Sequence, residues 1–469
     1  MAPWGWTVTM VGAVSSALAG AARPLLAQQD SSASVDSSAS VDSAASVDER
    51  LQELDQQIRV LKRQRELEQD SLAAASKDRP KVTADKDGFW IRSGDGKFAL
   101  HLGGYIQADS RTFLDDEADN LTNTFLLRRA RALIEGTVFK YFDFRLLPDW
   151  GGGTAVIQDV YVAARVRPYL KLQAGKFKAP VGLERLQSST DLLFIERAFP
   201  SAVAPNRDLG FVLTGDIADA MVQYNVGIFD GVVDGASLDT DLGDDKDFEG
   251  RIYLTPFKQS SIAFLNGLSV GVGGTIGNEH GTQAAPALAS YKSPGQNTFF
   301  SYRSDATAGA AVADGQRWRI SPQAYWSIGP VGLLGEWIRS SQEVSRAPAT
   351  ATIGVTAWQA AGSFALTGEN ASYRGLSPRK PVTAKGYGAF EVVGRYSELT
   401  VDDEAFPTFA DPARSARKAK EWAVGLTWYA ERRIKIAVNY GQTSFNGGAG
   451  GGADRATEKA LLTRFQVAF

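Results

Sequence analysis

The amino-acid sequence predicts an all-β fold: a sixteen-stranded antiparallel transmembrane β-barrel, preceded by an N-terminal coiled-coil helix. Three observations carry this prediction. Apolar and polar residues alternate in segments from about residue 88 to the C-terminus, tight joints alternate with long ones, and the last strand ends in an aromatic residue. Each is typical of a water-filled barrel in lipid, where one face of a strand meets lipid and the other lines water.

The composition narrows the classes of function. The 469 residues include 47 Gly, 24 Phe, 14 Tyr and 10 Trp, but no Cys and 2 His. A chain without cysteine has no disulfide, no thiolate metal site and no cysteine nucleophile, and two histidines leave little imidazole chemistry. We therefore expect no catalytic residue, no metal and no cofactor. The formal net charge of -3 argues against a nucleic-acid partner.

The first 27 residues predict a signal peptide. The apolar run from Val8 to Ala22 is shorter than the roughly 20 residues that a membrane-spanning helix needs. A cut after Ala27 leaves a polar start. No Lys or Arg precedes the run, so an incorrectly chosen start codon remains open.

Residues 28–48 predict a flexible spacer, since they contain the tandem hexads SSASVD, SSASVD and SAASVD. Residues 49–76 predict a helix that Asp48 can cap, with an apolar stripe at 3-4-3 spacing: Leu51, Leu54, Ile58 and Leu61. We expect a short coiled coil between subunits, in the periplasm. A lone amphipathic helix is the alternative.

The barrel is expected over residues 88–469. In EWAVGLTWY, Trp422, Val424, Leu426 and Trp428 share one face. In VIQDVYVAARV, a mostly apolar row that includes Gln158 lies opposite Asp159, Tyr161 and Arg165. The expected strands are 97–109, 125–139, 141–147, 156–166, 169–177, 209–217, 219–229, 247–257, 268–278, 316–328, 330–343, 353–366, 386–401, 419–429, 431–445 and 459–469.

The joints between these strands alternate in length, as short periplasmic turns and longer external loops do. Tight joints are expected near Lys140, Arg167-Pro168, Ala218, Gly329-Pro330 and Ala430. The joint at 367–385 is too long for a tight turn.

The C-terminal stretch RFQVAF places Phe465, Val467 and Phe469 on one strand face, and Arg464 and Gln466 on the other. We expect this strand to close the barrel beside the first. A terminal aromatic resembles the assembly signal of outer-membrane barrels, which implies that the barrel assembly machinery recognises Phe469.

Six segments in this order resemble the phosphate-selective porin O and P family. They are LGGYIQAD (102–109), FLLRRARALIEG (125–136), LQAGKFKAPVGLERLQSS (172–189), FIERAF (194–199), ALTGEN (365–370) and WAVGLTWYAERRIKIAVNYG (422–441). The resemblance implies a homotrimer in the lipid of the bacterial outer membrane, with a constriction loop near 179–208. The implied function is passive diffusion of small anions, phosphate or related oxyanions.

The resemblance also implies an anion site made of Arg128, Arg129, Arg185, Arg197, Ser188, Ser189 and the lumen acid Asp159. From residue 128 to 207, thirteen Lys/Arg face seven Asp/Glu, a difference of +6. Arginine suits an oxyanion because its planar donors bind two oxygens at once. Where phosphate-selective members carry a basic residue in the LGG segment, this chain has Tyr105, which weakens phosphate specificity.

Alternatives stay open for several of these residues. Arg128 and Arg129 are adjacent, so a regular strand points them to opposite faces, and one of them can bind an acid at a subunit contact. Five further charges are expected to line the lumen without a specific role: Arg131, Arg145, Arg165, Lys176 and Lys178. The acidic segments 115–120 and 239–249 can repel anions or bind divalent cations.

Other functions are less favoured by the sequence. A general diffusion porin or a structural envelope tether is compatible with the same barrel. An outer-membrane hydrolase would depend on His101 or His280, and neither lies in a catalytic motif.

Overall fold

A computed structural model describes residues 42–85, 88–114, 121–237, 239, 243–304 and 309–469. The chain divides into two units, Met1–Ala73 and Ala74–Phe469. The expected signal peptide lies outside the described residues, as do the acidic segment 115–120 and part of 239–249.

Helix α1 (Asp42–Asp78) begins inside the expected spacer and contains the helix expected at 49–76. Its apolar stripe is exposed, with Leu51 57% and Leu61 63% exposed. An i, i+4 ion pair joins Arg59 to Asp55 at 2.6 Å. Neither α1 nor any other described helix is long and apolar enough to cross a bilayer.

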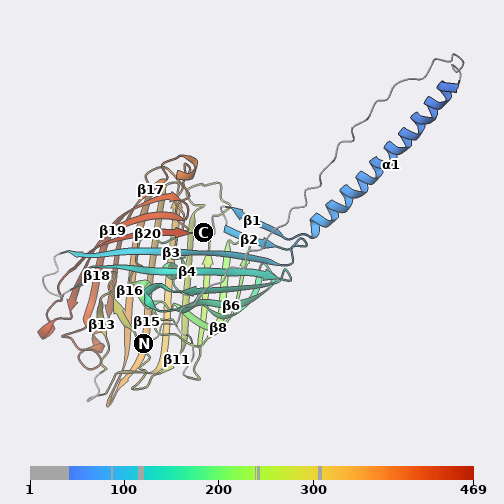
Figure 1. The fold of residues 1–469 in the computed structure, drawn as a ribbon. Helices are drawn as coiled ribbons and strands as arrows, with labels where there is room; N and C mark the ends of the chain where they lie inside the picture. Colours follow the sequence, from blue (N-terminus) through green and yellow to red (C-terminus); the bar gives the residue numbers. More distant parts are fainter. Residues whose placement is uncertain (1–41, 86–87, 115–120, 238, 240–242, 305–308) are drawn as a thin grey trace, which may run out of the picture. The chain divides into compact units, whose positions relative to one another are not determined.

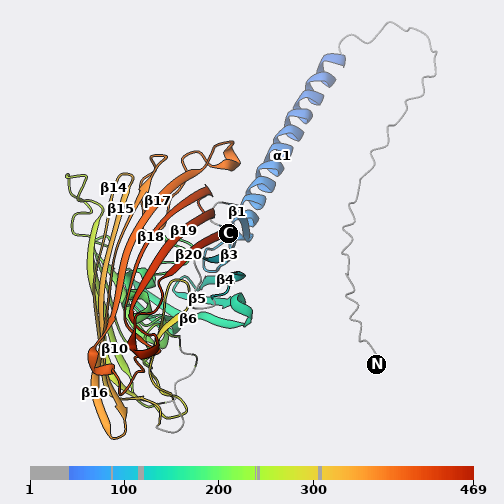
Figure 2. The same cartoon turned by 90° about the vertical axis from the view of Figure 1, so that its left-hand side faces the viewer.

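Sixteen strands of the described residues form a closed antiparallel barrel, as predicted (Figure 1). Each pairs with the next, and β20 pairs with β3 to close the ring. The barrel strands are β3 (Ala99–Leu114), β4 (Thr124–Val138), β5 (Phe142–Asp149), β6 (Val156–Arg167), β7 (Leu170–Lys178), β8 (Arg207–Ile217), β9 (Val222–Phe229), β10 (Asp247–Leu254), β11 (Leu268–His280), β14 (Val312–Ile328), β15 (Val331–Arg346), β16 (Ala349–Ala365), β17 (Ala389–Val401), β18 (Ala416–Glu431), β19 (Ile434–Gly447) and β20 (Glu458–Ala468). Figure 2 shows β14 to β20 side by side in one curved wall.

Side chains alternate between lipid and lumen along the strands, as the sequence indicated. In β18, Trp422 and Val424 are 43% and 49% exposed on the outer face, whereas Ala423 is buried. In β20, Phe465 is 51% exposed, and Arg464 is buried inside the barrel. The outer faces are therefore apolar and the inner faces polar or small.

Two β-bulges break this alternation. The β3–β4 register jumps from Gln107↔Arg129 to Ala108↔Leu127, so Arg128 is the extra residue. The β5–β6 register skips Gln158 in the same way. A bulge lets two adjacent residues face the same side. The assignment of Gln158 to the apolar face was therefore wrong, since Gln158 and Asp159 both line the lumen cavity.

A hairpin precedes the barrel. Strand β1 (Lys81–Asp85) pairs with β2 (Gly88–Arg92), and β2 pairs with residues 99–102 of β3. Strand β20 covers β3 only from Tyr105 onward. The hairpin thus pairs with the part of β3 that the C-terminal strand does not reach.

The joints at the end that holds both the hairpin and the C-terminus are mostly short, with 168–169, 329–330 and 432–433 as the tightest. The joint 366–388 at this end is long, as expected, and 255–267 is longer than a tight turn. At the opposite end the loops are mostly long, although β15 and β16 are joined only by residues 347–348.

One long loop fills part of the lumen. Its described residues, 281–304 and 309–311, carry the small strands β12 (Ser290–Lys292) and β13 (Thr298–Ser301). Phe299 and Phe300 of this loop are fully buried and pack in one apolar cluster with Phe199 and Val203. The cluster continues into the wall of β15 to β19, so this side of the barrel is closed by side chains.

Candidate functional site

Residues 179–206, between β7 and β8, fold into the barrel; they correspond to the constriction loop that the resemblance implies, and we use that name for them. The wall satisfies the backbone of this loop directly. Leu183 N–H donates to Glu336 Oε1 at 2.6 Å, and Ile195 N–H donates to Asn439 Oδ1 at 2.7 Å. Gln466 Nε2 donates to the Thr190 carbonyl at 3.1 Å. Buried backbone groups need such partners, so these wall residues fix the path of the loop.

Buried charges hold the same loop. Arg395 donates to both carboxylate oxygens of Glu421, at 3.0 and 2.9 Å, and to the Glu196 carbonyl at 2.9 Å. Within the loop, Glu184 Oε2 accepts from Ala198 N–H at 2.8 Å and from Ser201 Oγ at 3.0 Å. The constriction loop is therefore fastened to β14–β20 and leaves its other side facing the lumen.

That other side borders an open cavity of about 1960 Å³. Its lining comes mainly from β3 to β9 and the constriction loop. It extends from residues 278–296 in the long-loop region to Arg432, Arg433 and Phe469 at the turn end. The cavity thus borders the constriction loop and has lining residues towards both ends of the barrel.

Several arginines of this cavity are neutralised by a carboxylate. The pairs are Arg128–Glu196 at 2.6 Å, Arg131–Asp149 at 2.7 Å, Arg145–Glu135 at 2.6 Å and Arg207–Asp159 at 2.7 Å. Because each pair carries no net charge, its field on a passing ion is weak. Asp159, the expected lumen acid, is therefore the ion-pair partner of Arg207.

Several other cations of the cavity have no carboxylate within 4.0 Å among the described residues, and four of these lie on β4, β7 and the constriction loop: Arg129, Lys178, Arg185 and Arg197. We call these four the unpaired cations. Their direct hydrogen-bond partners among the described residues are neutral acceptors.

The unpaired cations are held by carbonyl and amide oxygens. Lys178 Nζ and Arg197 Nη2 donate to the same Gln187 carbonyl, at 2.8 and 2.7 Å. Arg129 Nη1 donates to Gln107 Oε1 at 2.7 Å. Arg185 Nη2 donates to the Ser201 carbonyl, and its buried Nε has no partner. These contacts orient the side chains and leave donors for an anion.

Arg185 stays cationic near neutral pH. Burial, together with Arg197 and Arg207, lowers the pKa of Arg185 to about 9. Burial also lowers the pKa of Arg197. Burial favours a raised pKa for Glu196, but Arg128 outweighs it and the pKa of this carboxyl falls below its usual range.

Tyr105 on β3 links the constriction loop to β4 through its hydroxyl group. Its hydroxyl lies 2.6 Å from Ser189 Oγ, and Arg131 Nη1 donates to it at 2.7 Å. Ser189 is buried, whereas Ser188 is exposed, with its hydroxyl 2.8 Å from that of Thr190. Both serines line the cavity, and Ser189 is already engaged by Tyr105.

The bulge at Arg128 brings the adjacent arginines to one side. Arg128 and Arg129 both line the cavity, and the acid that Arg128 binds is Glu196 of the same chain. The opposite-face alternative for this pair was therefore wrong.

Two expected lumen charges lie elsewhere. Lys176 is buried and paired with Asp239, and Arg165 pairs with Asp143 at 3.0 Å. Neither lines the cavity, although Arg131, Arg145 and Lys178 do.

Sequence reasoning missed Arg207 and Arg251, which also line the cavity. Arg251 is buried, donates to Gln323 Oε1 at 3.1 and 2.9 Å, and stacks 4.3 Å over the Tyr253 ring. One sequence signal could have identified Arg251. In the segment DFEGRIYL, it lies two residues after Glu249, so strand alternation puts both side chains on the same, inward face.

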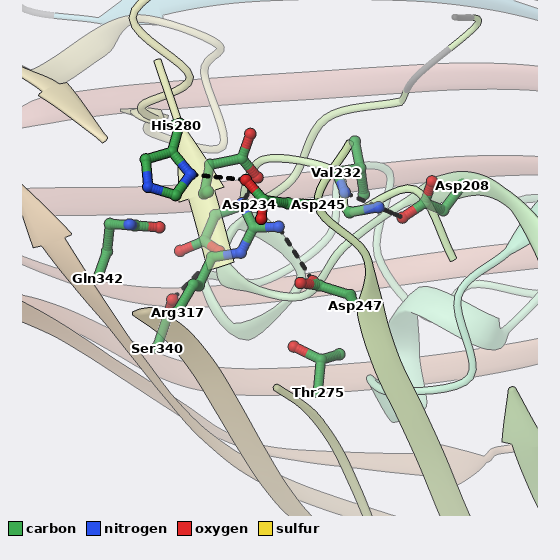
Figure 3. A network of polar contacts seen from close by, with 12 residues as sticks. Asp208, Val232, Asp234, Asp245, Asp247, Thr275, His280, Arg317, Ser340 and Gln342 are labelled. Atoms are coloured by element: carbon green, nitrogen blue, oxygen red, sulfur yellow. Dashed lines mark hydrogen bonds and ion pairs between the residues drawn. The ribbon is translucent and has the colours of Figure 1, made fainter. Parts of the chain in front are cut away.

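A second polar network fixes residues 230–237 beside the cavity (Figure 3). Arg319 binds Asp234 at 2.6 Å, and Arg317 Nη2 binds Asp247 at 3.0 Å. Asp208 Oδ2 accepts from the Gly231 and Val232 N–H groups at 3.0 and 2.9 Å. These fully buried pairs serve as anchors for the loop between β9 and β10.

The two histidines take part in carboxylate pairs. His101 Nδ1 lies 3.0 Å from Glu135, and His280 Nδ1 lies 2.6 Å from Asp245 (Figure 3). Across the described part of the chain, no group of three or more His, Cys, Asp or Glu side chains is arranged to hold a metal ion.

Comparison with known proteins agrees with this architecture. The family model for phosphate-selective porin O and P matches residues 100–469. Porin O of Pseudomonas aeruginosa is 24% identical over 389 residues, which cover 76% of this chain and 86% of that protein. Among solved structures, the outer-membrane expressed OmpT of Vibrio cholerae is 9% identical in sequence. The alignment covers 83% of this chain and 100% of the OmpT chain, and the TM-score of 0.51 shows that the fold is shared. The chain belongs to the phosphate-selective porin O and P family and is an outer-membrane diffusion channel.

Proposed function

We propose that the channel carries small anions by passive diffusion, with phosphate or a related oxyanion as the preferred class. The observation that carries this proposal is the set of unpaired cations at the constriction. The name of the family and its relative Porin O support the same direction.

The physical reason for anion preference is that the unpaired cations have no carboxylate next to them among the described residues. Salt screens exposed charges over a Debye length of about 8 Å at physiological ionic strength, so screening is incomplete for an ion inside a narrow lumen. Guanidinium groups replace part of the hydration of an oxyanion with paired hydrogen bonds. Cations should meet repulsion at the same point.

Preference among anions depends on Tyr105. Its hydroxyl lies in hydrogen-bond contact with Ser189 Oγ and adds no charge. Compared with family members that carry a basic residue here, the pore therefore offers phosphate one cation fewer and one free serine hydroxyl fewer. We propose moderate phosphate binding on top of general anion preference.

Tyr105→Arg tests this point. The added cation should lower the phosphate concentration that half-blocks single-channel chloride current, by about tenfold if the gain is about 1.4 kcal/mol. Tyr141→Arg, at an exposed joint outside the cavity, is the matched control. Equal phosphate block in wild type and Tyr105→Arg would remove the phosphate part and leave a general anion pore.

We further propose that the channel is a homotrimer in outer-membrane lipid, with the N-terminal segment in the periplasm and Phe469 recognised by the barrel assembly machinery. The exposed stripe of α1 supports contact between subunits through that helix. A barrel that served only as an envelope tether would show little or no ion conductance.

A further inference from the structure

The turn-side part of the cavity has an aromatic wall next to Arg251. The Arg251 guanidinium lies 4.3 Å from the Tyr253 ring centroid. Tyr325 and Tyr373 meet edge to face at 5.5 Å. These three tyrosines pack around Leu183 of the constriction loop, and all five residues line the cavity.

This wall differs from an ordinary porin lumen, which is polar. A small hydrated anion gains nothing from tyrosine rings. An anion that carries a planar ring gains apolar contact and stacking, and Tyr rings provide both. Arginine stacked on an aromatic face is weakly hydrated and binds planar carboxylates well.

Arg251 retains the capacity to bind an anion. Its Nε and Nη2 share one acceptor, Gln323 Oε1, and it has no carboxylate within 4.0 Å among the described residues. The Tyr325 hydroxyl donates to no described residue. By contrast, the other arginine–tyrosine contacts of the cavity, Arg131–Tyr105 and Arg145–Tyr161, involve arginines already paired with carboxylates.

We propose that Arg251, Tyr253, Tyr325 and Tyr373 form a subsite for small aromatic carboxylates on their way through the pore. The carboxylate binds Arg251, and the ring lies against the tyrosines and Leu183. This subsite rests on the proposed anion function and names a further class of substrate for the same lumen.

Benzoate and acetate test the subsite, because they share the carboxylate and differ in the ring. Each is titrated against chloride current through single channels of the purified full-length protein. Benzoate should half-block at a concentration several-fold below that of acetate. Tyr253→Leu, which keeps bulk but loses the aromatic face, should raise the benzoate value about three- to tenfold and leave acetate unchanged.

Three further variants make the result specific. Tyr253→Phe keeps the ring and should retain the benzoate value. Arg251→Gln should weaken the block by both carboxylates. Tyr141→Leu, outside the cavity, should change neither. The wild-type comparison stands even where a variant fails to fold.

Equal half-blocking concentrations of benzoate and acetate in wild type would overturn the subsite while anion preference in KCl stays intact. So would equal effects of Tyr253→Leu and Tyr253→Phe. Cation preference of the wild-type pore in KCl would instead overturn the proposed anion function, and the subsite with it.

Discussion

Arg128 and Arg129 are neighbours in sequence, yet their electrostatic roles differ. Arg128 donates to Glu196 at 2.6 and 3.1 Å, so its charge is compensated. Among the described residues, Arg129 donates only to the neutral Gln107. The charge that an ion meets therefore depends on the nearest carboxylate and not on the number of arginines.

Glu196→Gln separates these two roles. Removal of this carboxylate frees Arg128 from its partner and adds one net positive charge beside the cavity. We expect a stronger anion preference, measured as a larger reversal potential in a KCl gradient. Arg111 and Arg464 also lie within 4.0 Å of Glu196, so thermal resistance should fall.

Asp403→Asn, an exposed acid outside the cavity, serves as the control and should change neither quantity. A reversal potential for Glu196→Gln equal to or smaller than the wild-type value would contradict this account of Arg128.

All seven expected site residues line one cavity in the structure, and the resemblance was the signal that named them; strand alternation alone separated Arg128 from Arg129. The sequence did not reveal the bulge at Arg128 or the partner Glu196. Which cation finds a carboxylate depends on contacts between the constriction loop and the wall, and these contacts join residues far apart in the chain.

At the scale of elements, the barrel closes through β20, β3 and β2. Phe469 N–H donates to the Gly104 carbonyl, and Gly104 N–H donates to the Phe469 carbonyl, both at 3.0 Å. A Cβ on Gly104 would lie 2.6 Å from the Arg131 carbonyl oxygen, so glycine permits this close approach. Phe89 of β2 meets the Phe469 ring edge to face at 6.3 Å.

Phe469→Ala removes the half-exposed ring at this junction. The loss of apolar contact is on the order of 1–2 kcal/mol, and the assembly signal is removed as well. We expect lower levels of the heat-resistant folded form in the outer membrane. Phe125→Ala, an exposed phenylalanine on β4 away from the closure, is the control. Equal levels of both variants and wild type would contradict this role of Phe469.

Deletion of residues 49–71 tests the expected coiled coil. If the stripe of Leu51, Leu54, Ile58 and Leu61 packs between subunits, the trimer should dissociate at a lower temperature while the barrel remains folded. The matched variant exchanges Leu54 and Ile58 for Ala. Identical dissociation temperatures with and without the stripe would sink the idea.

The barrel strands were predictable because a strand with one lipid face has a period of two, which short-range patterns reveal. The hairpin of β1 and β2 was not, since five-residue strands give a weak pattern. The loop 281–311 also escaped prediction, because Phe299 and Phe300 are buried by residues from distant strands.

At the scale of the whole molecule, the lumen has two sides. One side is closed by described residues of the loop between β11 and β14, such as Phe299 and Phe300, and by the constriction loop, which pack against β15 to β19. The other side is the open cavity along β3 to β9, with the unpaired cations on its path. The proposed anion preference rests on this arrangement.

The reversal potential of the purified pore across a KCl gradient tests this central claim most directly, in wild type and in Arg185→Glu, with Arg165→Glu as the control outside the cavity. We expect anion preference in wild type, a loss or reversal of that preference in Arg185→Glu, and no change in Arg165→Glu. Cation preference in wild type, or an Arg185→Glu pore that selects anions as wild type does, would contradict the account.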